Sequence, residues 1–220
     1  MNLARIDTRA TLKDCERRIF SLRADLPAAR SLLVAISGID GSGKGYTSSL
    51  LAEYLRARAL SVAVLNIDGW LNLPSVRFRT SRPHEHFYRN AIRFDEMFRN
   101  LVLPLRDRRS VRLEADFAEE TASSYRRHLY AYEDVDVILL EGIYLLKREH
   151  RHHYDLSIWV ECSFETALER AITRSQEGLT PAETVRAYRT IYFPAQALHF
   201  AVDGPRDAAD LVVLNDAELD

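Results

Sequence analysis

The stretch LVAISGIDGSGK, residues 33–44, decides the fold of this chain. Its first four apolar residues predict a buried strand, and the glycines and lysine that follow match the spacing G-x-x-x-x-G-K of a phosphate-binding loop. The residues from Tyr46 to Arg56 continue it as a predicted helix. In this context backbone N–H groups point at phosphate oxygens, and the helix N-terminus adds partial positive charge. We therefore expect Lys44 to bridge the β- and γ-phosphates of a nucleotide.

The residue after Lys44 departs from the motif. Gly45 stands where a Ser or Thr hydroxyl normally ligates Mg²⁺. Three alternatives stay open: Thr47 or Ser48 supplies a hydroxyl from a shifted helix start, water fills the position, or the site depends less on metal. The residues expected to contact the nucleotide are Gly38, Asp40, Gly41, Ser42, Gly43, Lys44, Gly45, Tyr46 and Thr47.

Composition narrows the class of protein. Acidic and basic residues nearly cancel to a formal net charge of -2, which disfavours nucleic acid as a partner. No apolar stretch approaches the roughly 18 residues that cross a bilayer, and only two cysteines occur, so we expect a cytoplasmic protein that does not bind membranes. Three of the 30 basic residues are lysine and the others are arginine. A lysine in the glycine loop of such a chain indicates a need for its compact charge, which fits a crowded phosphate better than a planar guanidinium does. The oligomeric state is left open, a homo-oligomer included.

Apolar runs along the chain predict a single sheet. Five runs rich in Val, Ile and Leu are expected as strands buried on both faces: Leu32–Ser37, Val62–Ile67, Val135–Leu140, Leu156–Val160 and Leu211–Leu214. Helical patterns separate most of them, which indicates parallel pairing through right-handed crossovers. We therefore expect an α/β protein with the three-layer P-loop NTPase fold and a central, mostly parallel five-stranded sheet.

Helical periodicity and the remaining segments complete the predicted organisation. One helix is predicted from His84 to Val102, with a buried stripe formed by Phe87, Ala91, Phe94, Phe98 and Leu101. Residues 1–27 are expected to form an N-terminal amphipathic helical extension packed outside the sheet and its helices, with partner binding as the alternative use. Residues 28–220 are expected to form the nucleotide-binding domain. For residues 110–120 the sequence allows either a small β structure or a loop.

Two carboxylates are expected beside the phosphate loop. Asp68 follows the second predicted strand and Glu141 ends the third, so both lie at the carboxyl edge of the sheet together with Lys44. A carboxylate there can deprotonate an acceptor hydroxyl or ligate Mg²⁺. A turn or N-cap role for Asp68, and a chance acidic strand end for Glu141, remain the alternatives.

Together these motifs resemble the uridine kinase and phosphoribulokinase family of P-loop kinases, bacterial uridine kinase-like proteins in particular. The resemblance rests on the loop 38–44, Asp68 before an aromatic residue, Phe94-Asp95, Glu141-Gly142 and the arginine-bearing stretch 169–174. It implies transfer of the γ-phosphate of ATP to a sugar-like hydroxyl of a small molecule, with Asp68 as base and Glu141 near Mg²⁺. Arg170 and Arg174 are implied in a lid, near residues 170–182, that closes over the phosphates.

The acceptor site is the least defined part of the resemblance. It implies that Asp95 binds a sugar, and the sequence places Trp70 and Tyr88 as candidates to line the acceptor pocket beside Asp68, a core role being their alternative. The tyrosine and histidine by which uridine kinases recognise the pyrimidine are replaced by the stretch 114–120, and residues 175–178 replace an arginine-rich part of the lid. The alternative hypothesis is a regulatory nucleotide-binding protein with this fold and reduced catalysis.

Overall fold

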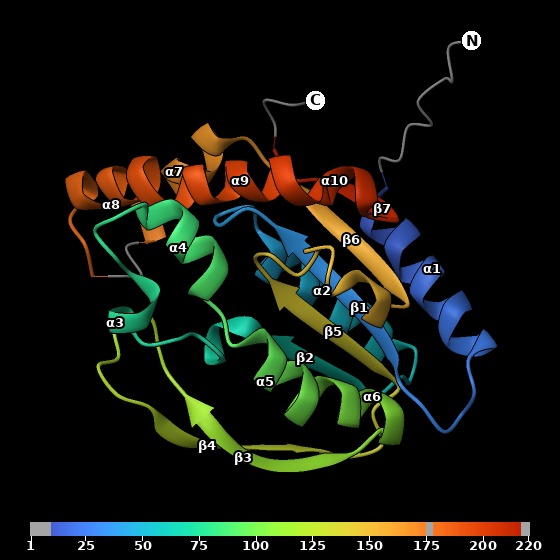
Figure 1. The fold of residues 1–220 in the computed structure, drawn as a ribbon. Coiled ribbons are helices and arrows are strands. Elements are labelled where there is room, and N and C mark those ends of the chain that lie inside the picture. The colour runs from blue at the N-terminus through green and yellow to red at the C-terminus, as the bar shows by residue number, and fades with distance from the viewer. Residues whose placement is uncertain (1–9, 175–177, 217–220) are drawn as a thin grey trace.

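The computed structural model describes residues 10–174 and 178–216 of the 220-residue chain. Its central sheet has the order β2-β5-β1-β6-β7, and all four pairings are parallel. The strands are β1 (Leu32–Gly38), β2 (Val62–Asn66), β5 (Val137–Gly142), β6 (Leu156–Glu161) and β7 (Leu211–Leu214). All five predicted strands are confirmed, because their continuous apolar runs fill a sheet that is covered on both faces (Figure 1).

Side chains of β1 alternate between two apolar layers. Leu32, Val34 and Ile36 face a cluster shared with α1 (Leu12–Asp25) and α2 (Lys44–Ala57). Leu33 and Ala35 face the larger cluster on the opposite side of the sheet. The expected three-layer α/β fold is therefore confirmed.

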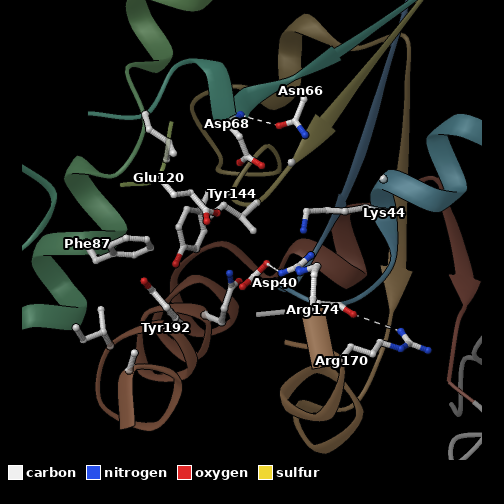
Figure 2. Close-up of a pocket in the computed structure, with 18 of the residues that line it drawn as sticks. Asp40, Lys44, Asn66, Asp68, Phe87, Glu120, Tyr144, Arg170, Arg174 and Tyr192 are labelled. Atoms are coloured by element: carbon white, nitrogen blue, oxygen red, sulfur yellow. Dashed lines mark hydrogen bonds and ion pairs between the residues drawn. The ribbon is translucent and has the colours of Figure 1, made fainter. Parts of the chain in front are cut away.

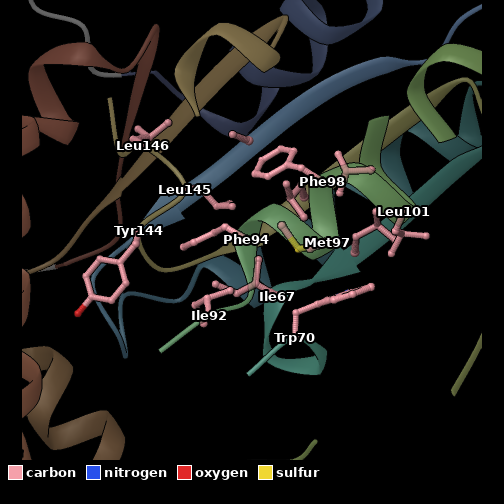
Figure 3. Packing of buried hydrophobic residues seen from close by; sticks show 14 of the residues in the cluster. Ile67, Trp70, Ile92, Phe94, Met97, Phe98, Leu101, Tyr144, Leu145 and Leu146 are labelled. Atoms are coloured by element: carbon pink, nitrogen blue, oxygen red, sulfur yellow. The ribbon is translucent and has the colours of Figure 1, made fainter. Parts of the chain in front are cut away.

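Most of the helices that follow β2 supply side chains to the larger cluster. They are α4 (Pro83–Asn90), α5 (Phe94–Met97), a π-helical turn (Phe98–Val102) and α6 (Leu103–Arg108), and the short α3 (Pro74–Arg77) precedes them. Figure 3 shows Phe94, Met97, Phe98 and Leu101 packed against Ile67 and Leu145. This layer supports the segment that carries Asp68 after β2.

The continuous helix predicted from His84 to Val102 is wrong. The chain leaves helical geometry after Asn90, where the N–H of Asn72 donates to the carbonyl of Ala91 (2.9 Å) and the N–H of Arg93 donates to that of Trp70 (2.9 Å). The interruption covers close to one helical turn, so the buried stripe stays in phase across it. The five stripe residues are buried as expected, although Ala91 lies in the break and the others lie before and after it.

The rest of the chain forms a hairpin and a C-terminal helical layer. Residues 110–120 belong mainly to β3 (Val111–Phe117), which pairs antiparallel with β4 (Arg126–Tyr132). The C-terminal layer contains α7 (Phe164–Arg174), α8 (Pro181–Ala187), a π-helical turn (Tyr188–Tyr192), α9 (Phe193–Asp203) and α10 (Pro205–Ala208). Short 3-10 turns occur at Ile67–Gly69 and Arg151–His153. Within the described ranges, no helix has the length and apolar character needed to cross a membrane.

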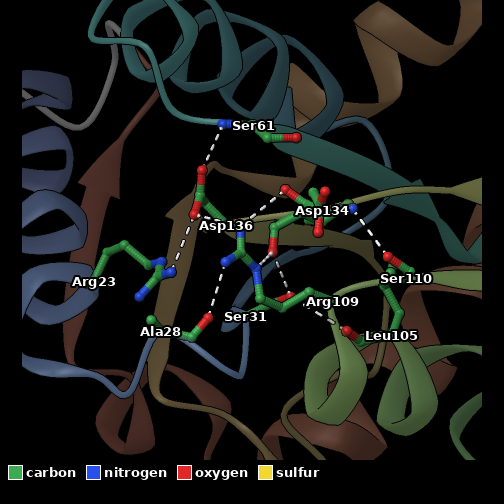
Figure 4. A network of polar contacts seen from close by, with 10 residues as sticks. Arg23, Ala28, Ser31, Ser61, Leu105, Arg109, Ser110, Asp134 and Asp136 are labelled. Atoms are coloured by element: carbon green, nitrogen blue, oxygen red, sulfur yellow. Dashed lines mark hydrogen bonds and ion pairs between the residues drawn. The ribbon is translucent and has the colours of Figure 1, made fainter.

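A polar network closes the amino edge of the sheet (Figure 4). Asp136 precedes β5, and its Oδ1 accepts hydrogen bonds from Arg23 and Arg109, both at 3.0 Å. Its Oδ2 accepts from the N–H of Ser61 at 3.0 Å. Arg109 also donates to the carbonyl of Ala28 at 2.9 Å. These bonds join α1, α6 and the starts of two strands, so the charge of Asp136 has a structural use.

Candidate active site

The glycine loop is shaped by contacts that only glycine tolerates. Gly41 and Gly43 have φ values of 79° and 89°, in the left-handed region. A Cβ atom at Gly41 would lie 2.6 Å from the carbonyl oxygen of Ala167, and one at Gly43 would lie 2.1 Å from Nδ2 of Asn215. Lys44 begins α2, and its Nζ donates to the carbonyl of Ile39 across the loop at 3.2 Å. The backbone therefore has the form of an anion cradle at a helix N-terminus.

Arg170 holds the glycine loop from outside. Its Nη1 donates to the carbonyls of Gly41 and Ser42, both at 3.3 Å, and its Nη2 donates to that of Asn215 at 2.9 Å. The side chain of Asn215 donates to Ser42 as well, at 2.7 Å. Arg170 lines the cavity, yet these bonds use its guanidinium to position the loop.

Arg174, one turn later on α7, has a different partner. Its Nη2 lies 3.4 Å from Oδ1 of Asp40, and the hydroxyl of Tyr188 donates to the other oxygen of the same carboxylate. Burial opposes ionisation of Asp40, but Lys44, Tyr188 and Arg174 outweigh it and lower the pKa of this carboxyl. Arg170 thus binds backbone carbonyls of the loop, whereas Arg174 binds the carboxylate of Asp40 in the same loop.

Asp68 and Glu141 lie at the carboxyl edge of the sheet, as the sequence predicts. Asn66, at the end of β2, pairs in register with Glu141 of β5, and Asp68 follows two residues later. Burial, with smaller contributions from Asp68 and Asp40, raises the pKa of Glu141 from 4.5 to about 7, against the opposing charge of Lys44. Burial also raises the pKa of Asp68, again against Lys44. Carboxylates therefore accumulate on this edge beside a single loop lysine.

The environment of Gly45 decides one of the open alternatives. Helix α2 starts at Lys44 without a shift, and Thr47 and Ser48 are buried outside the cavity. The hydroxyl of Ser48 donates to the carbonyl of Gly45 at 2.9 Å, so it serves the helix backbone. Neither residue replaces the missing hydroxyl.

One cavity of about 720 Å³ connects these groups (Figure 2). In that view Lys44, Arg170 and Arg174 lie on one side, Phe87, Tyr144 and Tyr192 lie on the other, and Asp68 lies between them. From the loop, the cavity is lined by Asp40, Gly41, Gly43, Lys44, Gly45 and Tyr46. Gly38, Ser42 and Thr47, also predicted to contact nucleotide, are buried and do not line the cavity. The phosphate side and an aromatic side thus share one space.

Three residues assigned to the acceptor from sequence lie outside the cavity. Trp70 is 1% exposed and stacks on Tyr130 in the apolar core, at 5.6 Å between ring centroids. The hydroxyl of Tyr88 donates to Asp203, away from Asp68. Asp95 is exposed on α5. The structure does not bring these three residues to the cavity, so their roles at the acceptor stay predictions.

Other residues line the acceptor side instead. Phe78, Phe87, Tyr144, Tyr192 and Gln196 line it, together with Arg77 and Glu120. Arg77 is 4% exposed, and its guanidinium donates to the carbonyl of Glu120. Tyr144 follows Glu141-Gly142 by two residues, so its position next to a predicted site motif could have indicated a place at the cavity. No sequence pattern marks Gln196 on α9, because its place at the cavity depends on the packing of the C-terminal layer.

The predicted lid lies partly within the described chain. Arg170 lies one turn before Arg174, the last residue of α7. Leu179 lines the cavity, and α8 starts at Pro181. Residues 175–177, which belong to the predicted lid, lie outside the described residues. The described part of the lid therefore borders the phosphate side of the cavity.

Comparisons with known proteins agree with this geometry. The model of the Phosphoribulokinase / Uridine kinase family matches residues 33–180. No curated protein sequence matches the chain.

Solved structures share the fold. A possible uridine kinase from Bacillus stearothermophilus is 20% identical, with a TM-score of 0.68 over 90% of this chain and 98% of that chain. A provisionally assigned fructose transport system kinase from Silicibacter sp. TM1040 is 21% identical, with a TM-score of 0.67 over 93% and 98%. A D-glycerate 3-kinase from Cryptococcus neoformans var. grubii serotype A is 13% identical, with a TM-score of 0.65 over 96% and 97%. At these identities the likeness concerns the fold alone.

Proposed function

We propose, since this chain belongs to the phosphoribulokinase and uridine kinase family, that it transfers the γ-phosphate of ATP to a hydroxyl of a nucleoside or related sugar-containing small molecule. The observation that carries the proposal is one cavity lined by Lys44, Asp68 and Glu141 on its phosphate side and by aromatic and amide side chains on its other side. A nucleotide and a second, smaller molecule have separate places in such a space.

The roles follow from the chemistry of phosphoryl transfer. The loop amides and Lys44 hold the phosphates, and Asp68 accepts the proton of the acceptor hydroxyl as its oxygen attacks the γ-phosphorus. The bond between that phosphorus and the β-phosphate oxygen of ADP breaks. A raised pKa makes Asp68 a stronger base than an ordinary carboxylate, which suits this step.

The charge of the site fits a divalent cation. Glu141 and Asp68 line the cavity with the oxygen donors that Mg²⁺ prefers. Burial chiefly raises the pKa of both carboxyls, so a bound cation would stabilise their charged forms. These two carboxylates are the residues that would hold the ion. When bound, Mg²⁺ neutralises charge on the β- and γ-phosphates. Water at the place facing Gly45 is the proposed substitute for the absent hydroxyl.

Arg170 and Arg174 take different parts in this proposal. Arg170 positions the loop through its backbone carbonyls. Arg174 is paired with Asp40, and we infer that phosphate competes with Asp40 for its guanidinium. Arg170 is thus a positioning residue, and Arg174 is the arginine proposed to contact phosphate.

The proposal is tested by incubating the protein with ATP, Mg²⁺ and a panel of uridine, cytidine, D-ribose, D-fructose, D-glycerate and pantothenate. Mass spectrometry of the products and release of ADP are measured together. We expect acceptor-dependent ADP release with a phosphorylated product. ATP binding without transfer to any acceptor would contradict the proposal and favour the regulatory alternative, whereas ADP release without a product would identify an ATPase.

A further inference from the structure

Two polar groups on the acceptor side of the cavity are buried without a partner. The hydroxyl of Tyr144 and Oε1 of Gln196 make no hydrogen bond to any of the described residues, although their residues are only 1% and 2% exposed. A buried polar atom without a partner destabilises a folded protein, and most such atoms are paired. Both residues line the cavity, so a molecule inside it can supply the missing partners.

The backbone of Tyr144 is strained as well. Its φ of 60° lies in the left-handed region, which is an outlier for a bulky residue. Such strain clusters at functional sites. Phe87 packs edge-on against the ring at 6.5 Å, and Tyr88 does so at 5.4 Å, so the ring is fixed in place. The fold thus holds this hydroxyl in position at an energetic cost that its own packing does not explain.

The two groups differ in hydrogen-bonding capacity. Burial raises the pKa of Tyr144 well above its ordinary value, so the hydroxyl keeps its proton and remains a donor. The amide oxygen of Gln196 only accepts. A hydroxyl group can accept from one and donate to the other, whereas a carboxylate cannot donate to Gln196 and an ammonium group cannot accept from Tyr144.

The neighbouring wall is aromatic. The rings of Phe87 and Tyr192 lie 5.1 Å apart between centroids, and Figure 2 shows both beside Tyr144. A carbon skeleton with C–H groups on one face and hydroxyls on its edge matches such a surface. Sugars and other polyols have this combination.

We propose that Tyr144 and Gln196 form the specificity site for the acceptor, and that the acceptor is a polyhydroxylated molecule with one hydroxyl at Asp68 and a second between Tyr144 and Gln196. The inference rests on the proposed kinase function and refines its acceptor. A free sugar, a sugar acid and the ribose of a nucleoside all carry this chemistry, and the acceptor panel distinguishes them.

The test uses Tyr144→Phe and Gln196→Met, with the best acceptor of the panel. Each variant should raise the KM for that acceptor about tenfold and leave the KM for ATP unchanged, because one hydrogen bond to the acceptor is removed. One deoxy analogue of the acceptor should lack the hydroxyl that binds Tyr144. With the wild type its kcat/KM should be about tenfold lower than that of the acceptor, and with Tyr144→Phe the two kcat/KM values should be equal.

Stability without acceptor separates this role from a structural one. Tyr144→Phe removes an unpartnered hydroxyl, so the urea midpoint of the protein alone should stay unchanged or rise. Tyr154→Phe is the matched control, because the hydroxyl of Tyr154 donates to the carbonyl of Leu145 at 2.9 Å outside the cavity. It should lower the urea midpoint and leave the acceptor KM unchanged.

The outcomes are distinct. Unchanged acceptor KM values for both cavity variants, in an enzyme that phosphorylates a panel compound, would overturn this inference and leave the kinase proposal intact. A lowered urea midpoint for Tyr144→Phe without acceptor would overturn it too. Transfer to no panel compound would overturn both proposals.

Discussion

Strand β5 carries a carboxylate at each end, in opposite surroundings. At the amino end, Asp136 accepts hydrogen bonds from two arginines and a backbone N–H, all at 3.0 Å. At the carboxyl end, Glu141 is buried near Asp68 and Asp40, and its pKa is raised to about 7. A carboxylate thus stabilises the fold at the amino edge, whereas burial disfavours the charged form of the carboxylate at the carboxyl edge. The contrast indicates that the carboxyl edge is maintained for function.

The largest effect is expected from Lys44→Met. Lys44 is the lysine of the glycine loop, and its loss should lower the rate of phosphoryl transfer by about 10²–10³, as for other groups that stabilise transition-state charge. The measurement is acceptor-dependent ADP release at saturating ATP. The matched control is Lys13→Met, because Lys13 is exposed on α1 and does not line the cavity. A control that loses as much activity would contradict the assignment.

Glu141→Gln should change how stability depends on pH. The pKa of Glu141 is raised from 4.5 to about 7 in the folded protein, so its contribution to the free energy of unfolding is highest below pH 4.5 and falls as pH rises to 7. The fall is on the order of 3 kcal/mol, and Gln should abolish it. Urea unfolding at pH 5 and pH 8 measures this.

The control for Glu141 is Glu53→Gln, on an exposed position of α2. It should keep the pH dependence of the wild type. Mg²⁺ with ATP should bind with proton release near pH 7 in the wild type and not in Glu141→Gln. Equal pH dependence in wild type and Glu141→Gln would show that the charge of Glu141 is already compensated.

Asp136→Asn tests the opposite end of the strand. Replacing a carboxylate that accepts from two arginines should lower the free energy of unfolding by about 2 kcal/mol. The rate of phosphoryl transfer should remain that of the wild type, because Asp136 lies at the amino edge of the sheet. Unchanged stability would remove the contrast between the two edges.

The smallest effect is expected from Gly45→Ser. A Cβ at Gly45 has Oε1 of Glu141 at 3.8 Å, an ordinary contact, so a serine hydroxyl fits beside the carboxylates. It should lower the Mg²⁺ concentration that half-saturates ATP binding by about fivefold. Gly45→Ala adds the same Cβ without the hydroxyl and is the control. An equal shift in both variants would show that backbone stiffening alone is responsible.

The sequence predicted the fold and the phosphate side well, for physical reasons. Buried parallel strands are continuous apolar runs, and the loop around Gly41 and Gly43 is a local backbone structure. Both features therefore leave a pattern in consecutive residues. The break after Asn90 was not readable, because the apolar stripe continues in phase across it. Its cause is hydrogen bonding to Trp70 and Asn72, which are distant in sequence.

The acceptor side could not be predicted in the same way. Trp70 and Tyr88 are aromatic residues near Asp68 in sequence, yet tertiary packing turns them into the core and toward Asp203. Gln196 reaches the cavity from α9, more than a hundred residues after Asp68. Residues that meet only through the packing of separate layers leave no local pattern.

The most direct test of the contrast between the two edges is Asp68→Asn, assayed for both turnover and unfolding. We expect turnover with the best acceptor to fall by about 10², because the base is lost. The free energy of unfolding should stay unchanged or rise, because burial raises the pKa of Asp68 and folding therefore opposes its charge. Wild-type turnover in Asp68→Asn would contradict the account.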